Sequence, residues 1–271
     1  MIELFEQDLH GMDRQSSKGN QLKWKNKDKW YKADYLGYEG LVEYLVSHLL
    51  LRSSLTEEEV TLYETEQIRY QGNIYSGCVS QSFLREGEQL LTLERLFRNE
   101  TGHSFYLSVF SVRNHFERFS YLVNQTERYT QLNGVGEYLA KLMTIDMLFL
   151  NEDRHLHNIA VIEDANGSYR FSPVFDLGAG LLSDTRLEYP QGQDVYDMVK
   201  RVKAKTISDD FEEQEEIASS TYGTTVRFSF TQKDVEELLI QEQYYPEDTK
   251  NRVRTILFEQ MRKYPYLFSS G

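Results

Sequence analysis

The chain has 271 residues, of which 40% are hydrophobic and 13% aromatic, so it can bury the core of one two-lobed domain or two small domains. Its net charge of −13 argues against direct, nonspecific binding to nucleic acid or anionic lipid. A single cysteine, Cys78, excludes an internal disulfide and favours a reducing compartment. No signal peptide and no membrane-spanning run is evident, so we expect a cytoplasmic protein. Secretion as an effector without a signal peptide stays open.

The first third of the chain predicts a small, mostly antiparallel sheet with one helix. Residues 21–25 and 29–34 are expected to form two short strands around Asn26-Lys27-Asp28. Runs rich in Thr, Tyr, Ile and Val predict further strands over residues 60–69 and 73–84. Apolar residues at helical spacing predict a helix over residues 37–51.

From residue 88 onward helices dominate the predicted structure. The expected helices span residues 92–98, 113–124, 135–150, 232–241 and 247–263. The short acidic run at 209–216 is interpreted as a solvated surface. A sheet with one helix followed by a helical remainder makes an α+β chain.

One β-hairpin is predicted over residues 159–174. Its centre is Asn166-Gly167, the strongest short signal for a two-residue type I′ turn. Counting outward from that turn brings Asn158 and Asp176 close together at the open end of the hairpin. Asp153 lies in the loop just before the first strand.

Two carboxylates and an amide oxygen at one place suit a magnesium-bound phosphate, with one carboxylate left to act as a base. Each such residue alone is also common at turns and caps. A second hypothesis uses His155 and His157 with Asp153 and Asp176 as the metal site of a hydrolase. Residues two apart converge on one metal only on a strand, so this alternative is the weaker one.

The segment Asp153-Arg-His-Leu-His-Asn158, followed by Phe175-Asp-Leu-Gly178, resembles the catalytic and metal-binding loops of the HipA-like kinases. These are bacterial serine/threonine kinases of toxin–antitoxin type, and a similar motif occurs in the phosphatidylinositol 3- and 4-kinases. The resemblance implies a bilobal α+β kinase fold. A small antiparallel-sheet N-lobe would occupy residues 1–85, and a mainly helical C-lobe residues 86–271.

The resemblance also implies the roles of three residues. Asp153 would be the catalytic base, and Asn158 and Asp176 would be the magnesium ligands. The implied reaction uses ATP and Mg²⁺ to phosphorylate a serine or threonine of a protein substrate, with an antitoxin-like protein as a possible partner. A lipid or small-molecule kinase and a catalytically silent nucleotide-binding regulator stay open as alternatives.

A kinase N-lobe supplies a lysine for the α- and β-phosphates and an acidic residue on the next helix that holds it. Lys32 is the candidate lysine because it lies on the second strand, just before the predicted helix. Glu43 is the candidate acid, with Glu39 one turn earlier as the alternative. Lys29 and Lys23 remain competitors of Lys32.

The implied nucleotide site also needs a phosphate loop, a hinge strand behind the adenine, and support beneath the catalytic loop. The chain has neither Gly-x-Gly-x-x-Gly nor a Walker motif, so its phosphate loop departs from the usual kinase pattern. The candidates are Ser17 and Lys18 for the phosphate loop, Ser80, Gln81 and Ser82 for the hinge, and His155 for the support.

Two other features leave both a structural and a functional reading open. Asp146 shares an apolar helix face, where a charge is costly unless hydrogen-bonded, so it either braces the catalytic loop or marks the helix edge. A basic cluster in a segment placed like an activation segment is either a solvated surface or part of a nucleotide cleft. Its members are Lys200, Arg201, Lys203 and Lys205.

Overall fold

A computed structural model describes residues 1–9 and 21–268, so the phosphate-loop candidates Ser17 and Lys18 lie outside the described residues. The chain divides into two compact units. Unit 1 comprises residues 1–83, 175–202 and 227–271, and unit 2 comprises residues 84–174 and 203–226. The lobe boundary expected between residues 85 and 86 stays a prediction.

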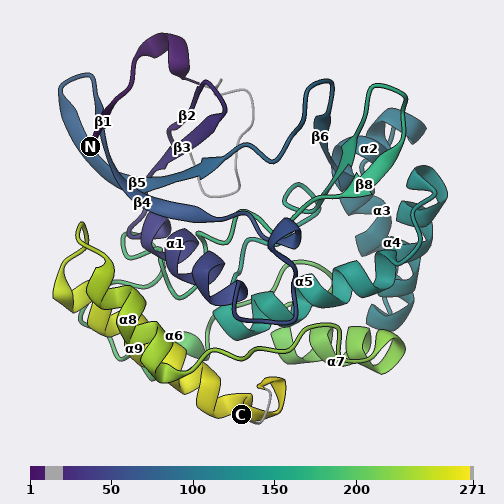
Figure 1. The fold of residues 1–271 in the computed structure, drawn as a ribbon. Coiled ribbons are helices and arrows are strands. Elements are labelled where there is room, and N and C mark those ends of the chain that lie inside the picture. Colours follow the sequence, from purple (N-terminus) through teal and green to yellow (C-terminus); the bar gives the residue numbers. More distant parts are fainter. Residues whose placement is uncertain (10–20, 269–271) are drawn as a thin grey trace. The chain divides into compact units, whose positions relative to one another are not determined.

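Unit 1 contains a five-stranded sheet with the strand order β1-β4-β5-β3-β2 (Figure 1). The strands are β1 (Ile2–Glu3), β2 (Lys23–Asn26), β3 (Lys29–Ala33), β4 (Tyr63–Tyr70) and β5 (Asn73–Gln81). All neighbours pair antiparallel except β1 and β4, which run parallel. Trp24, Tyr31 and Ile68 bury one face of this sheet.

The helices of unit 1 are α1 (Glu39–Leu50), α6 (Val195–Val199), α8 (Gln232–Gln241) and α9 (Glu247–Lys263). Helix α1 packs against β4, β5 and α8. Glycine permits the close approach of α1 to β5, because a Cβ on Gly40 would lie only 2.5 Å from the carbonyl carbon of Gly77.

Unit 2 contains a three-stranded sheet with the order β6-β7-β8, and most of its helices lie between β6 and β7 along the chain (Figure 1). Its strands are β6 (Gln89–Thr92), β7 (Ala160–Glu163) and β8 (Tyr169–Phe171). Its helices are α2 (Leu93–Thr101), α3 (Phe105–Ser111), α4 (His115–Thr130), α5 (Val135–Phe149) and α7 (Phe211–Tyr222). Helix α5 packs against α4 and α7.

The acidic run at 209–216 is not simply a solvated surface, as the sequence suggested. It forms the start of α7, where the Asp210 side chain accepts hydrogen bonds from the backbone N–H groups of Glu212 and Glu213. Acidic residues favour a helix N-terminus because they satisfy its unpaired N–H groups and its positive dipole. Gln214 in the same turn is buried.

The hairpin exists, but its predicted turn is wrong. Val161 pairs with Phe171 and Ile162 with Arg170, one residue out of the expected register. The backbone of Asp164 bonds to Ser168, which leaves a three-residue loop in which Gly167 has a φ of 79°. The Asp164 carboxylate accepts from the N–H groups of Asn166 and Ser168 and so favours this loop over the type I′ turn.

The strands of the hairpin end at Ala160 and Phe171. The strand pairing therefore does not extend to Asn158 and Asp176, and the register count that predicted their proximity does not apply. In the described part of the chain, no helix has the length and apolar character needed to cross a membrane.

Candidate functional site

Unit 1 brings three of the predicted site residues together around one ammonium group. Lys32 lies on β3, and its Nζ is 2.6 Å from Oε1 of Glu43 on α1 and 2.7 Å from Oδ1 of Asp176. The ammonium also lies over the ring of Tyr63, 5.0 Å from its centroid. A lysine on a strand thus bridges a helix carboxylate and a loop carboxylate.

The electrostatics of this group keep Lys32 charged. Burial lowers the pKa of the ammonium, but the Asp176 and Glu43 carboxylates raise it more, so the net pKa lies well above its usual value. The Glu43 side chain is only 2% exposed, whereas that of Asp176 is 25% exposed. Glu43 therefore serves as an internal anchor, and Asp176 is the carboxylate that solvent or a ligand can reach.

The loop that carries Asp176 is held in an uncommon conformation. Asp176 has a φ of 59°, a left-handed geometry that costs free energy in a non-glycine residue. The second oxygen of Glu43 accepts the N–H of Leu177 at 2.9 Å, which fixes the residue next to it. Gly178 lets the loop lie close to α1, because a Cβ there would come within 3.3 Å of the Glu43 side chain.

The alternatives to Lys32 and Glu43 have other surroundings. Both carboxylate oxygens of Glu39 accept backbone N–H groups, from Leu36 at 2.6 Å and Gly37 at 3.0 Å. Lys29 is exposed at the start of β3, and Lys23 is the cross-strand partner of Lys32 on β2. The structure thus places the Lys32–Glu43 pair together and gives Glu39 a role in the turn before α1.

The three hinge candidates lie at the end of β5. Ser80 is paired on both sides, with Trp30 of β3 and Tyr63 of β4, and Gln81 pairs with Lys29. The N–H of Ser82 donates to the carbonyl of Asp28 at 2.7 Å. Much of the local backbone is therefore engaged within the sheet, and the adenine-binding role of these residues stays a prediction.

Unit 2 brings Asp153 and Asn158 together in the loop between α5 and β7. The Asn158 Nδ2 donates to the Asp153 carbonyl at 2.8 Å and to the Asp153 Oδ2 at 3.1 Å. These bonds orient the carboxylate and direct the amide nitrogen of Asn158 toward Asp153. The Asn158 Oδ1 is then the atom of this side chain suited to bind a metal ion.

His155 lies beside the same carboxylate. Its Nε2 is 3.6 Å from Oδ1 of Asp153, and its Nδ1 accepts the N–H of His157 at 3.2 Å. An accepting Nδ1 places the ring proton on Nε2, which faces Asp153. Burial lowers the pKa of His155, and the Asp153 charge opposes this only in part, so the ring is neutral at pH 7.

Asp146 braces the loop between α5 and β7 from within, which is one of the two roles that the sequence left open. Arg154 donates from Nε to Oδ2 of Asp146 at 2.9 Å and from Nη2 to Oδ1 at 3.1 Å, and both side chains are buried. Asn151 donates to the same carboxylate, and Arg154 also donates to the Asn158 carbonyl. Burial raises the pKa of Asp146, and Arg154 and Asn151 counteract part of this rise. This network ties both ends of the loop to α5.

The basic cluster does not act as one surface. Lys200 pairs with Asp197, Arg201 with Gln193, and Lys203 with Asp209, all exposed. Lys205 differs from these residues, because its Nζ is 3.9 Å from Oδ1 of Asp153. No spacing rule predicts this contact, since it joins residues more than fifty positions apart.

The side chains fit a magnesium–nucleotide group better than a metal held by protein alone. Mg²⁺ at such sites takes one or two protein oxygen ligands and completes its shell with phosphate and water. The described residues contain no group of three or more His, Cys, Asp or Glu side chains that could hold a metal ion. The hydrolase alternative with His155 and His157 stays a prediction.

The fold is that of the HipA-like kinases, which confirms the predicted fold class. The structure of the proinflammatory kinase CtkA of Helicobacter pylori is similar over 91% of this chain and 89% of that one, with a TM-score of 0.58 and 15% identity. HipA of Shewanella oneidensis MR-1, solved with HipB and operator DNA, is similar over 96% of this chain and 67% of that one, with a TM-score of 0.55 and 14% identity. No protein-family model matches the chain, and no curated protein matches it.

Proposed function

We propose that the protein is an ATP- and Mg²⁺-dependent kinase that transfers the γ-phosphoryl group to a serine or threonine hydroxyl of a protein. The observation that carries this proposal is the contact of Lys32 with both Glu43 and Asp176. A lysine–glutamate pair beside a reachable aspartate is the set that phosphoryl-transfer enzymes of this fold use to hold nucleotide phosphates and metal.

In unit 1 the proposed roles follow from the charge of each side chain and from its exposure to a ligand. The Lys32 ammonium binds the α- and β-phosphates, and Glu43 holds it on the strand. Asp176 would be a carboxylate ligand of Mg²⁺, which would neutralise charge on the nucleotide phosphates.

In unit 2 the proposed roles fall to the catalytic loop. Asp153 accepts the proton of the acceptor hydroxyl and orients it, while Asn158 holds the Asp153 carboxylate and gives its Oδ1 to a metal ion. Arg154 and Asp146 keep the loop in place from the interior. His155 supports the same carboxylate as a neutral ring.

The test is transfer from labelled ATP by the purified protein with Mg²⁺, alone and with a cell lysate. We expect label on serine or threonine of the protein itself or of a lysate protein. Asp153→Asn should lower transfer by about 10²–10⁴-fold and leave ATP binding unchanged, because the base acts only in the transfer step. Asp176→Asn should weaken the Mg²⁺-dependent part of ATP binding.

Two outcomes would contradict the proposed reaction. ATP binding without labelling of any protein would leave only a nucleotide-binding regulator. Labelling of lipid or of a small molecule, with no labelled protein, would favour the runner-up kinase class.

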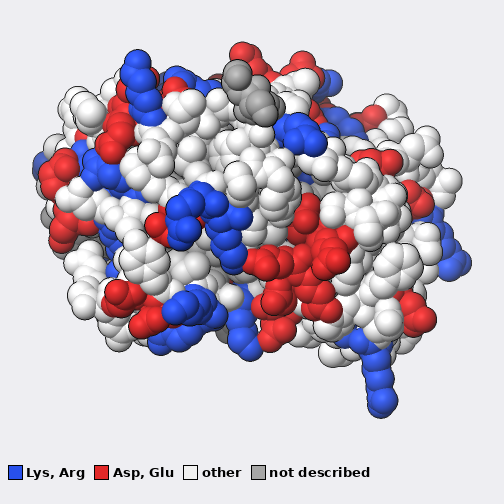
Figure 2. Space-filling model, turned by 90° about the horizontal axis from the view of Figure 1, so that it is seen from below, with Lys and Arg blue, Asp and Glu red and all other residues white. Residues whose placement is uncertain are grey.

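An antitoxin-like protein partner belongs to the same proposal, because the similar HipA structure contains HipB. The proposal does not include direct contact with nucleic acid, because the net charge of the chain is −13. Figure 2 shows one face on which acidic side chains gather in a patch and basic side chains form separate small groups. Purification of the tagged protein from its own host tests for a bound partner.

A further inference from the structure

The segment from residue 203 to residue 210 has no regular structure, yet its backbone is held at many points. The Oε1 of Gln214 accepts the N–H groups of Thr206 at 3.1 Å and Ile207 at 2.9 Å. The Ala204 N–H donates to the carbonyl of Asp209 at 3.1 Å. Ala204, Thr206 and Ile207 are all buried.

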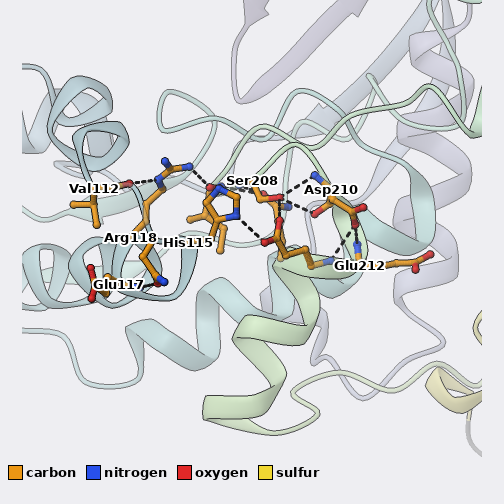
Figure 3. Close-up of polar contacts among 11 residues, drawn as sticks. Val112, His115, Glu117, Arg118, Ser208, Asp210 and Glu212 are labelled. Atoms are coloured by element: carbon orange, nitrogen blue, oxygen red, sulfur yellow. Dashed lines mark hydrogen bonds and ion pairs between the residues drawn. The ribbon is translucent and has the colours of Figure 1, made fainter.

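Side chains from α4 and α7 fix the same segment from the other side (Figure 3). Arg118 donates to the carbonyls of Val112 and Ile207. The Ser208 hydroxyl donates to Glu213 at 2.5 Å, and the other oxygen of Glu213 lies 2.7 Å from Nδ1 of His115. Side chains of both helices thus hold the backbone and the Ser208 hydroxyl of this segment.

This anchored segment is tied directly to the catalytic loop. The Thr206 hydroxyl donates to the carbonyl of Arg154, the residue after Asp153, at 2.7 Å. Lys205 stands between the buried Ala204 and Thr206, so the backbone sets its direction. Its side chain is 41% exposed, and its ammonium lies 3.9 Å from Oδ1 of Asp153.

A cation in this position adds little to the stability of the fold, and it does not make Asp153 a stronger base. The Lys205–Asp153 distance is too long for a hydrogen bond, and the Lys205 side chain is 41% exposed, so this contact adds little stability. A positive charge beside a carboxylate also makes it a weaker proton acceptor. The same charge is useful where negative oxygens of a transferring phosphoryl group pass close to Asp153, because phosphoryl transfer depends on positioning and charge stabilisation more than on base strength.

We infer that Lys205 is a further catalytic residue, whose ammonium binds the oxygens of the γ-phosphoryl group as it passes to the acceptor beside Asp153. This inference rests on the proposed kinase function. The Lys205 ammonium lies 3.9 Å from Oδ1 of Asp153, and Nε2 of His155 lies 3.6 Å from the same oxygen. Lys205 therefore supplies a positive charge on this side of the carboxylate.

The chain offers a matched control in Lys203, two residues earlier. Its ammonium pairs with Asp209 at 2.8 Å, and its side chain is 68% exposed. Lys205→Met and Lys203→Met each remove one positive charge from the same segment. Lys205→Arg keeps the charge at position 205. Titration with MgATP and with MgADP measures the contribution of the γ-phosphate to binding, and steady-state labelling measures kcat and KM.

For Lys205→Met we expect a kcat about 10²-fold lower, the loss typical of one charge-stabilising group. The preference for MgATP over MgADP should disappear, while MgADP affinity stays within about threefold, since no β-phosphate contact is lost. Lys205→Arg should recover part of kcat, and Lys203→Met should match the unmodified protein.

Three outcomes would overturn the inference. Lys205→Met could keep both kcat and the MgATP preference, or Lys203→Met could lose as much as Lys205→Met. In either case the kinase function stands and Lys205 has no part in it. If the unmodified protein binds neither nucleotide, the proposed function fails and the role of Lys205 fails with it.

Discussion

At the scale of single residues, the buried Asp146–Arg154 pair holds the loop that carries Asp153 and Asn158. Asp146→Ala would leave the Arg154 guanidinium buried without its carboxylate, a change that costs about 3–5 kcal/mol of unfolding free energy. Denaturant unfolding followed by fluorescence measures this loss.

The control for Asp146→Ala is Asp209→Asn in the same unit. Asp209 pairs with Lys203 at the surface, where water screens the charges, so its loss should leave stability nearly unchanged. Equal unfolding curves for Asp146→Ala and the unmodified protein would show that the Asp146–Arg154 pair does not stabilise the loop.

Asp34 gives a residue-scale prediction about pH. Its carboxylate accepts the Gly40 N–H and the Tyr245 hydroxyl, both at 2.7 Å. Burial, and then the charge of Glu39, raise the pKa of Asp34 to about 7. A pKa that is higher in the folded than in the unfolded chain stabilises the fold at low pH, and this stabilisation is lost as the pH rises to about 7.

We therefore expect the unfolding free energy to fall by about 2–4 kcal/mol between pH 4 and pH 8 because of Asp34 alone. Asp34→Asn mimics the protonated acid and should remove this part of the slope. Urea unfolding at a series of pH values measures it, and parallel slopes for the two proteins would contradict the prediction.

At the residue scale, a contact could be predicted from sequence where it depends on local order. Lys32 and Glu43 could be proposed because a strand lysine directly precedes a helix, and the structure places the two in contact. From the sequence, Lys205 was one of four basic residues in a segment placed like an activation segment. Its nearness to Asp153 depends on contacts with Thr206 and Gln214 that no spacing rule reveals.

At the scale of elements, α1 determines where Glu43 meets Lys32, and Gly40 determines how closely α1 lies on β5. Gly→Ala within a helix normally stabilises it by about 1 kcal/mol. Here the new Cβ would come within 2.6 Å of the Tyr245 hydroxyl and 2.5 Å of the Gly77 carbonyl carbon. Gly40→Ala should instead destabilise the protein by about 1–3 kcal/mol and weaken ATP binding.

Gly72→Ala is the control for Gly40→Ala. A Cβ at Gly72 meets nothing within 4 Å, although its φ of 79° carries a cost of about 1–2 kcal/mol for alanine. This variant should lose some stability and keep its affinity for ATP. Unchanged ATP binding in Gly40→Ala would mean that α1 can shift without moving Glu43.

The helices with clear apolar periodicity were predicted well, and the short non-local strands were not. The expected helices at 232–241 and 247–263 are α8 and α9 to the residue. Strand β1 has two residues and pairs with β4, and β6 pairs with β7, from far along the chain in each case. Such strands carry too few residues for a period, and long-range pairing alone defines them.

At the scale of the whole molecule, ligand binding and stability are linked. A ligand that binds only the folded chain stabilises it by about 2.7 kcal/mol at one hundred times its Kd. For a chain of this length that corresponds to a rise in Tm of about 5 °C. We expect MgATP to give this rise, and chelation of Mg²⁺ to reduce it.

Lys32→Met should abolish most of the MgATP-dependent rise in Tm, because the phosphates lose their cation. It should also lower the starting Tm, since the Glu43 carboxylate is left buried without its ammonium partner. The change in Tm on adding MgATP, rather than the starting Tm, is therefore the quantity to compare. Lys29→Met is the control, because Lys29 lies exposed on the same strand and should leave the rise intact. If Lys32→Met keeps the full rise and Lys29→Met loses it, the phosphate-binding lysine of this chain is Lys29.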